Sequence, residues 1–407
     1  MKVCVIGGGA SGMMASMLIA EKQHHVVLLE KNEKLGKKLY ITGKGRCNLT
    51  NAVTGNEFLA NVVNNSKFVM SSEVRFNSSD TMRRFEDLGV KLKIERGNRV
   101  FPESDKASDI TRALERRLKI LGVDICLNTE VQEVIIENGE ARGVKLKSGD
   151  IILCDAVVVA TGGKSYPLTG STGDGYKFAR ETGHRIVDPV PALSAIILKD
   201  KSLKNLSGLS LKNVKIKAYN KKVLIYESSI GEMLFTGNGV SGPIVLSMSS
   251  YINRFLPQNL KIYIDFKPAL SDFALFQRIN REITALKSKQ FSSLLKLLLP
   301  SSLCDEFSKR LGINKTKKVN QLTSEEREKL CFMLKNFELN FDRLDDIDRA
   351  IITSGGVNVV DIKPKSMESK LVKRLYFIGE VLDIDALTGG FNLQLAFSTA
   401  ASCASDF

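Results

Sequence analysis

The first thirty residues limit the fold of this chain more than any other stretch. Residues 2–6 and 25–30 are short, nearly continuous apolar runs, and residues 10–22 between them have the pattern of a helix rich in small side chains. Short apolar strands on both sides of a helix indicate a buried parallel sheet. The stretch therefore predicts an α/β fold that begins with a Rossmann-like strand–turn–helix–strand unit.

The turn inside this unit reads Gly7-x-Gly9-x-x-Gly12. In such a unit the first glycine permits the tight turn, the second lets the backbone approach a pyrophosphate, and the third lets the helix pack on the strand. Glu30 ends the second strand 18 residues beyond Gly12. A carboxylate there accepts hydrogen bonds from ribose hydroxyls and disfavours the 2′-phosphate of NADP in this site. The residues predicted to bind a dinucleotide here are Gly7, Gly9, Ala10, Ser11, Gly12, Glu30 and Lys31.

Length and composition set broad limits on the class of protein. The 407 residues are enough for two or three domains, and no apolar run is long enough to predict a membrane span. The seven cysteines are scattered and never form a CxxC pair, which predicts free thiols in a reducing cytoplasm and no metal site.

The net charge of +14 favours an anionic partner. The charge is spread along the chain without obvious aromatic interleaving, which favours a solvated basic surface and disfavours a nucleic-acid partner. A small-molecule substrate and an anionic cofactor are the expected partners. The sequence leaves the oligomeric state open.

The pattern along the chain predicts four segments. Strands and helices that include 78–89, 107–121 and 151–159 continue the first segment, in which Ser108 is a candidate helix cap. Short strand-like pieces follow, then mainly helical residues in which Thr323 begins a capping box. We expect the cofactor domain at 1–190 and 351–407, a β-rich domain at 191–270, and a helical domain at 271–350.

Two later motifs favour FAD over NAD. An apolar strand ends at Ala160-Thr161-Gly162-Gly163, and a second ends at Gly379-Glu380-x-x-Asp383. Chains that bind FAD in an extended pose close the site with such a late strand–turn. A small-residue helix then begins near Gly390, and its N-terminal N–H groups could face the flavin. The candidate FAD-binding residues in these motifs are Thr161, Gly162, Gly379, Glu380, Asp383, Gly390, Phe391, Asn392 and Leu393.

A family resemblance covers almost the whole chain. The stretches VIGGGASGMMAS, LEKNEKLGKKLYITGKGRCNLTN, VVVATGGKSYPLTGSTGDGYKFARETGH and FIGEVLDIDALTGGFNLQLAFSTA, with shorter ones between them, resemble the BaiN/YhiN-like family of FAD-dependent oxidoreductases, also labelled aminoacetone-oxidase-family flavoproteins. The resemblance implies a bipartite FAD-binding domain of the glutathione-reductase type with an inserted β-barrel-like unit and a helical unit. It also implies a backbone contact of Val131 to the adenine, and FAD contacts by Lys37, Lys38, Thr42, Gly43, Gly45, Arg46, Cys47 and Asn48.

The segment GKGRCNLTN at 43–51 is consistent with that implication. With the preceding lysine pair it contains four cations within ten residues, interleaved with glycines whose N–H groups can bind anions. Cys47 could be a redox thiol beside the flavin, but that chemistry needs a resolving cysteine and none is near. A packing role is the better interpretation.

No catalytic residue can be named from the sequence. His184, Ser165 and Tyr166 are candidate proton donors, and His184 is better explained as a helix-end cation in a favourable dipole position. The expected activity is hydride transfer at flavin N5, with NADH or NADPH as reductant and a small conjugated enone as substrate. The alternatives are an amine oxidase, a flavin-binding sensor, or a flavin-binding RNA-associated protein without turnover.

Overall fold

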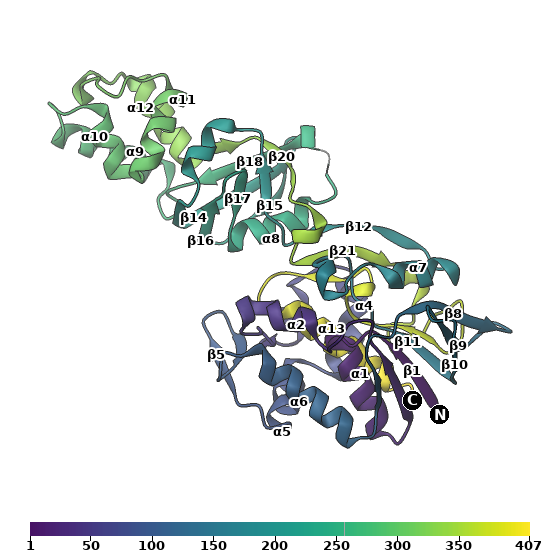
Figure 1. The fold of residues 1–407 in the computed structure, drawn as a ribbon. Helices are drawn as coiled ribbons and strands as arrows, with labels where there is room; N and C mark the ends of the chain where they lie inside the picture. The colour runs from purple at the N-terminus through teal and green to yellow at the C-terminus, as the bar shows by residue number, and fades with distance from the viewer. Residues whose placement is uncertain (256) are drawn as a thin grey trace. The chain divides into compact units, whose positions relative to one another are not determined.

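The computed structural model describes residues 1–255 and 257–407, and these form two compact units (Figure 1). The bipartite unit comprises Met1–Ala192 and Ile347–Phe407, and the inserted unit comprises Leu193–Asp346. Each unit has its own cluster of buried apolar side chains. The division of the insert into a β-rich and a helical domain stays a prediction.

A five-stranded parallel sheet lies at the centre of the bipartite unit. Its strand order is β22 (Leu375–Phe377), β11 (Ala156–Val159), β1 (Lys2–Ile6), β2 (His25–Leu29) and β7 (Asp124–Cys126). Each strand is parallel to its neighbour, and β1 is paired on both sides. Because β22 comes from the second part of the chain, the fold is completed only when the C-terminal segment returns. The predicted Rossmann-type α/β fold is confirmed.

Helices complete this unit. α1 (Ala10–Glu21) connects β1 to β2 and packs against α6 and α13. The other helices are α2 (Lys37–Ile41), α3 (Gly55–Leu59), α4 (Ser66–Arg75), α5 (Ser78–Asp87), α6 (Ala107–Ile120), α7 (Asp174–Glu181) and α13 (Phe391–Ala404). The predicted cap at Ser108 is wrong, because α6 already begins at Ala107 and its N-cap is Lys106.

Short antiparallel sheets surround the central sheet. They are formed by β8 (Val131–Glu137), β9 (Glu140–Leu146) and β10 (Ile151–Leu153); by β3 (Thr50–Asn51), β6 (Arg99–Pro102) and β5 (Leu92–Glu95); by β12 (Ile186–Ala192) and β21 (Ile352–Val357); and by β4 (Val62–Asn64) and β23 (Asp385–Ala386). The run 151–159 is two strands, since the chain leaves the β8–β10 meander after Leu153 and enters the parallel sheet at Ala156.

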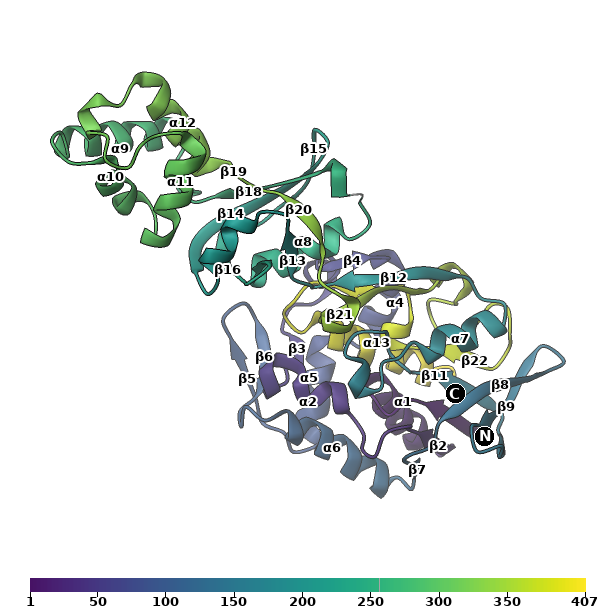
Figure 2. The same ribbon diagram turned by 45° about the horizontal axis from the view of Figure 1, so that its top comes forward.

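The inserted unit combines a curled eight-stranded antiparallel sheet with helices (Figure 2). Its strands are β13 (Ile196–Leu198), β14 (Ser210–Asn220), β15 (Val223–Glu227), β16 (Gly231–Phe235), β17 (Gly239–Ser241), β18 (Leu260–Asp265), β19 (Phe337–Leu339) and β20 (Phe341–Leu344). Its helices are α8 (Pro243–Ile252), α9 (Asp272–Ala285), α10 (Phe291–Leu298), α11 (Cys304–Leu311) and α12 (Ser324–Lys335). The predicted capping box is confirmed, with Thr323 and Glu326 each bonding the other's backbone. Within the described ranges, no helix is both long and apolar enough to cross a membrane.

Candidate cofactor site

The glycine turn between β1 and α1 combines two close backbone approaches with one open position. Gly7 has a φ of 105°, which favours glycine, and a Cβ added there would lie 2.6 Å from the Ala160 oxygen. A Cβ on Gly12 would lie 1.8 Å from the Gly7 oxygen, so the helix can pack here only without a side chain. A Cβ on Gly9 would meet nothing within 4 Å. The first-turn N–H groups of α1 therefore border an open space at the N-cap Gly9.

Glu30 lies directly beyond β2 and is buried beside this turn. Its Oε2 accepts a hydrogen bond from the Gly8 N–H at 2.8 Å, and its Oε1 accepts two from Asn32, at 2.8 Å from the backbone and 2.6 Å from Nδ2. A carboxylate has about four acceptor sites, so three bonds leave one for another donor. The carboxylate is thus held rigidly and can still receive a ribose hydroxyl.

The GKGRCNLTN segment has an irregular backbone between α2 and β3. Gly43, Lys44, Gly45 and Cys47 all have positive φ angles, and the Cys47 N–H donates to the Thr42 carbonyl oxygen at 3.0 Å. The Oδ1 atom of Asn48 is buried and has no hydrogen-bond partner among the described residues. A buried amide oxygen without a donor is uncommon and is typical of a position that a ligand or water satisfies.

Arg46 of this segment is already paired with two acidic side chains. The Arg46 guanidinium bonds Glu95 and Asp105 and lies over the Phe101 ring, 4.1 Å from its centroid. A cofactor phosphate would have to compete with both carboxylates, and the contact of Arg46 with FAD stays a prediction.

Cys47 is fully buried, and burial raises the pKa of its thiol to about 12. The thiol is therefore protonated at neutral pH, which argues against a redox thiolate.

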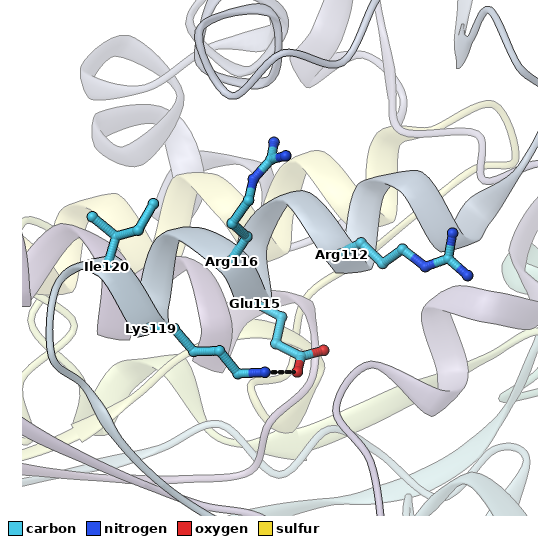
Figure 3. Close-up of a pocket in the computed structure, with 5 residues that line it drawn as sticks. All are labelled: Arg112, Glu115, Arg116, Lys119 and Ile120. Atoms are coloured by element: carbon cyan, nitrogen blue, oxygen red, sulfur yellow. Dashed lines mark hydrogen bonds and ion pairs between the residues drawn. The ribbon is translucent and has the colours of Figure 1, made fainter.

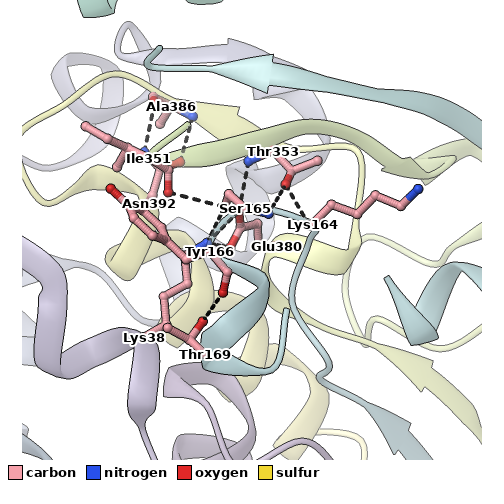
Figure 4. Close-up of polar contacts among 10 residues, drawn as sticks. All are labelled: Lys38, Lys164, Ser165, Tyr166, Thr169, Ile351, Thr353, Glu380, Ala386 and Asn392. Atoms are coloured by element: carbon pink, nitrogen blue, oxygen red, sulfur yellow. Dashed lines mark hydrogen bonds and ion pairs between the residues drawn. The ribbon is translucent and has the colours of Figure 1, made fainter. Parts of the chain in front are cut away.

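An ion pair joins segments that are far apart in the sequence (Figure 4). Lys38 on α2 donates to Glu380 Oε2 at 2.7 Å and to Ser165 Oγ at 2.6 Å. Glu380 Oε1 also accepts from the Thr353 backbone N–H at 2.9 Å and from Ser165 Oγ at 3.2 Å. Three of the predicted motifs thus converge on one half-buried cluster. Thr353 was missed, because nothing in its local sequence distinguishes it from any other strand residue.

We expect this ion pair to stabilise the bipartite unit. Changing Glu380 to Gln should lower the free energy of unfolding by about 1–3 kcal/mol, because Lys38 then keeps its charge without a counter-charge in a half-buried site. Changing both Lys38 to Met and Glu380 to Gln should cost less than the sum of the single changes. Urea unfolding of the four proteins measures this coupling, and strict additivity would contradict it. Lys37→Met is the matched control, because its partner Glu33 is largely exposed.

The N-terminus of α13 is fixed beside the GKGRCNLTN segment. Gly390 has a φ of 101°, and a Cβ added there would lie 2.3 Å from the Thr50 backbone. Asn392 holds the preceding turn through Ala386, accepting from its N–H at 2.9 Å and donating to its oxygen at 2.8 Å (Figure 4). The buried Gln394, which the sequence analysis missed, accepts from Thr50 Oγ1 at 2.6 Å. The sequence offers one indication of its role, because Gln394 is an amide on the otherwise apolar and small-residue buried face of α13.

Three further predicted residues, Lys31, Asp383 and Thr161, also belong to the bipartite unit. Lys31 pairs with Asp174 at 2.6 Å, and Asn65 donates to Asp383 Oδ2 at 3.0 Å. The Thr161 Oγ1 is buried and has no partner among the described residues. Together with Asn48 Oδ1 and the open space at Gly9, this unpartnered hydroxyl fits a bound dinucleotide. The contacts of individual residues with FAD stay predictions.

His184 is a structural residue at the end of α7. It is buried, its Nε2 is 2.7 Å from Ser369 Oγ and its Nδ1 is 2.9 Å from Thr182 Oγ1. The ring also packs edge-on against Phe377, with centroids 4.9 Å apart. Both ring nitrogens are engaged in hydrogen bonds within the fold, which argues against the general-acid interpretation.

We expect His184 to make the fold acid-sensitive. Burial lowers the pKa of its ring below the ordinary value, so near pH 6 the unfolded chain binds a proton that the folded chain does not. The free energy of unfolding should therefore fall as the pH drops below about 6.5, the ordinary histidine pKa. Denaturant unfolding at pH 7.5 and 5.5 should show a smaller fall in His184→Gln. An equal fall in both proteins would contradict this role.

A surface hollow on α6 is unrelated to this site. Its lining comes from one helix face, and Lys119 donates to Glu115 there at 2.7 Å (Figure 3). Arg112, Arg116 and Ile120 complete the lining. None of the predicted cofactor residues lines it.

Comparison with known proteins identifies the family of this chain. The family described as HI0933-like protein Rossmann domain matches residues 1–406. The chain belongs to this family. It is an FAD-dependent oxidoreductase of the BaiN/YhiN-like type, as its sequence predicts.

Relatives in the HI0933-like family match over nearly their full length. The ribosomal RNA dihydrouridine synthase of Haemophilus influenzae is 31% identical over 405 residues, covering 98% of this chain and 96% of the relative. The enzyme of the same name from Escherichia coli is 30% identical, covering 99% and 96%. The 3-dehydro-bile acid delta(4,6)-reductase of Clostridium scindens is 29% identical, covering 98% and 97%.

Solved structures share the fold at low sequence identity. A 3-ketosteroid delta1-dehydrogenase from Sterolibacterium denitrificans aligns with a TM-score of 0.54 and 13% identity, covering 100% of this chain and 99% of that one. A flavocytochrome c3 fumarate reductase aligns with a TM-score of 0.51 and 17% identity, covering 100% and 77%. These likenesses concern the fold alone.

Proposed function

We propose that this HI0933-like protein reduces a carbon–carbon double bond conjugated to a carbonyl group, with NADH or NADPH as the source of electrons. The observation that carries the proposal is shared by the full-length relatives. One is named for reducing double bonds of a 3-dehydro bile acid, and two for making dihydrouridine from uridine. An enone of that kind and a uracil ring both present a double bond conjugated to a carbonyl, so one reaction type covers both names.

Bound FAD would supply the hydride chemistry, by taking a hydride from the nicotinamide at N5 and passing it to the substrate. The residues of the chain would bind this cofactor and orient it. The turn at Gly9 and the first-turn N–H groups of α1 would receive the pyrophosphate, and the carboxylate of Glu30 would receive a ribose hydroxyl. The Lys38–Glu380 pair would fix the closing strand–turn against α2.

Two acceptors are compatible with this reaction, a small enone and a uracil ring within RNA. The distribution of charge between the two units supports RNA, in contrast to our expectation from the sequence that the charge is evenly spread and disfavours nucleic acid. The inserted residues 193–346 contain 25 of the 59 Lys and Arg but only 15 of the 45 Asp and Glu, so this unit carries +10 of the net +14. A polyphosphate chain is attracted to such a unit, whereas a small neutral enone is not.

Anaerobic turnover of the FAD-loaded protein tests the proposal. NADH and NADPH are each mixed with a 4-ene-3-keto steroid, a 4,6-diene-3-keto bile acid, or ribosomal RNA that contains no dihydrouridine. The expected result is loss of the conjugated absorbance, or formation of dihydrouridine detected by mass spectrometry of digested RNA. Oxidation of an amine with no reduction of any conjugated acceptor would favour an amine oxidase and overturn the proposal.

A further inference from the structure

One face of the insert sheet gathers lysines and tyrosines from strands that are distant in the sequence. On β14, Val214, Ile216 and Ala218 point into the core, while Lys215, Lys217 and Tyr219 alternate with them on the partly exposed side. On β18, the exposed Lys261 and the partly exposed Tyr263 alternate with buried Ile262 and Ile264. Register joins the two rows, because Lys217 is opposite Tyr263 and Tyr219 is opposite Lys261. We call Lys215, Lys217, Tyr219, Lys261 and Tyr263 the lysine–tyrosine face.

The two tyrosines of this face form a small aromatic platform. The rings of Tyr219 and Tyr263 are 5.9 Å apart and meet at 75°. Lysines border this platform on the same side of the sheet. An aromatic pair edged by cations on a sheet surface is typical of proteins that stack unpaired bases while binding the phosphates beside them.

The positive charge of the face is only partly neutralised from within. Glu227 on β15 is 3.4 Å from Lys215 and 3.8 Å from Lys217, so one carboxylate serves two lysines. Across the described part of the chain, no ion pair involves the exposed Lys261, or Lys221 and Lys222 at the β14–β15 turn. Two further acids lie on neighbouring strands: Asp265, which is opposite Lys215 and pairs with Lys335 at 2.7 Å, and Glu338, which is opposite Tyr263 on β19. The face and its turn thus retain a positive excess.

We propose that the lysine–tyrosine face binds a single-stranded segment of RNA, with bases on the tyrosines and phosphates at the lysines of the face and of the β14–β15 turn. Charge complementarity and the partly exposed aromatic pair favour single-stranded RNA over a folded protein, because a single strand can place phosphates at the lysines and bases on the rings. The inference deepens the proposed function, because it names the surface that would hold an RNA substrate. It concerns binding and involves no step of the reaction.

RNA binding to the FAD-loaded full chain tests the proposal. A fluorescein-labelled single-stranded oligouridylate is titrated at several salt concentrations and followed by anisotropy. The double variant Lys222→Ala/Lys261→Ala should bind at least tenfold more weakly, and the salt slope should fall by about 1.4, or roughly 0.7 for each lost phosphate contact to a single strand. Lys287→Ala/Lys289→Ala, which removes two exposed lysines beyond α9, is the matched control and should behave as wild type.

The aromatic part has its own test. Tyr219→Leu should weaken binding about fivefold or more, and Tyr219→Phe should not, because stacking needs the ring and not the hydroxyl. Wild-type affinity and salt slope in the lysine variant, or an equal loss in the control, would overturn the proposal. The proposal would also be overturned if the face variants bound RNA like the wild type but lost binding to anionic lipid vesicles. That result would assign the face to a membrane surface.

The same samples separate this inference from the proposed function. If the variants lose RNA binding but no conjugated acceptor is reduced by the wild type, the proposed reaction falls and the RNA-binding face stands. If a small enone is reduced normally while the face variants bind RNA like the wild type, the reaction stands and the face is refuted.

Discussion

Replacing Gly9 by alanine is expected to weaken FAD binding strongly while the fold remains, whereas replacing Gly12 by alanine is expected to destabilise the fold itself. A Cβ at position 9 meets no protein atom within 4 Å, and Gly9 has an ordinary negative φ of −80°. The added methyl group enters only the space that a pyrophosphate would need. We expect Gly9→Ala to weaken FAD binding by ~100-fold or more, which corresponds to ~2.7 kcal/mol, with an unchanged apoprotein melting temperature.

Gly12→Ala tests the opposite case within the same turn. The new Cβ would lie 1.8 Å from the Gly7 carbonyl oxygen, so α1 must move away from β1. Overpacking of this kind should lower the free energy of unfolding by about 3 kcal/mol or more. Apoprotein unfolding and FAD titration of both variants measure the difference. If Gly9→Ala binds FAD normally, the turn does not hold the pyrophosphate.

Removing the carboxylate of Glu30 is the second change with a large expected effect. Glu30→Ala should weaken FAD binding by about 1–3 kcal/mol, because a ribose hydroxyl loses its acceptor. The apoprotein should also lose stability, since the buried Gly8 N–H and the Asn32 backbone N–H lose their partner. Titration of the apoprotein with FAD, followed by flavin fluorescence, gives the affinity.

The control for Glu30 lies three residues away. Glu33 is an acid in the same loop, but its side chain is 62% exposed and it pairs with Lys37. Glu33→Ala should leave FAD affinity unchanged. Equal FAD affinity in Glu30→Ala and wild type would remove the predicted ribose contact, and equal losses in both variants would indicate a general charge effect.

Most of the fold could be predicted because its signals are local. The strand–glycine–helix–strand start needs only neighbouring residues, and β1, α1 and β2 match their predicted ranges within one residue. Errors arose where tertiary pairing divides a continuous pattern. The apolar run 151–159 gives no sign that two sheets share it, and Phe337 continues the apolar period of α12 but begins β19.

The site was predictable as a set of motifs but not as a network. Gly9, Glu30 and Glu380 could be predicted because each stands at a fixed spacing within a local motif. That Lys38 meets Glu380 and Ser165, or that Arg46 meets two acids, depends on the path of the chain between them. The lysine–tyrosine face illustrates the same limit. The segments KIKAY at 215–219 and KIY at 261–263 form one surface only because β14 pairs with β18.

Single turnover of the reduced protein tests the proposed reaction most directly. The FAD-loaded protein is photoreduced without oxygen and then mixed with a 4-ene-3-keto steroid, the matching saturated ketone, or uridine-containing ribosomal RNA. The account predicts that the flavin absorbance returns with at least one conjugated acceptor, in step with formation of its reduced product, and does not return with the saturated ketone. Reoxidation by the saturated ketone at the same rate, or by oxygen alone with every conjugated acceptor inert, would contradict it.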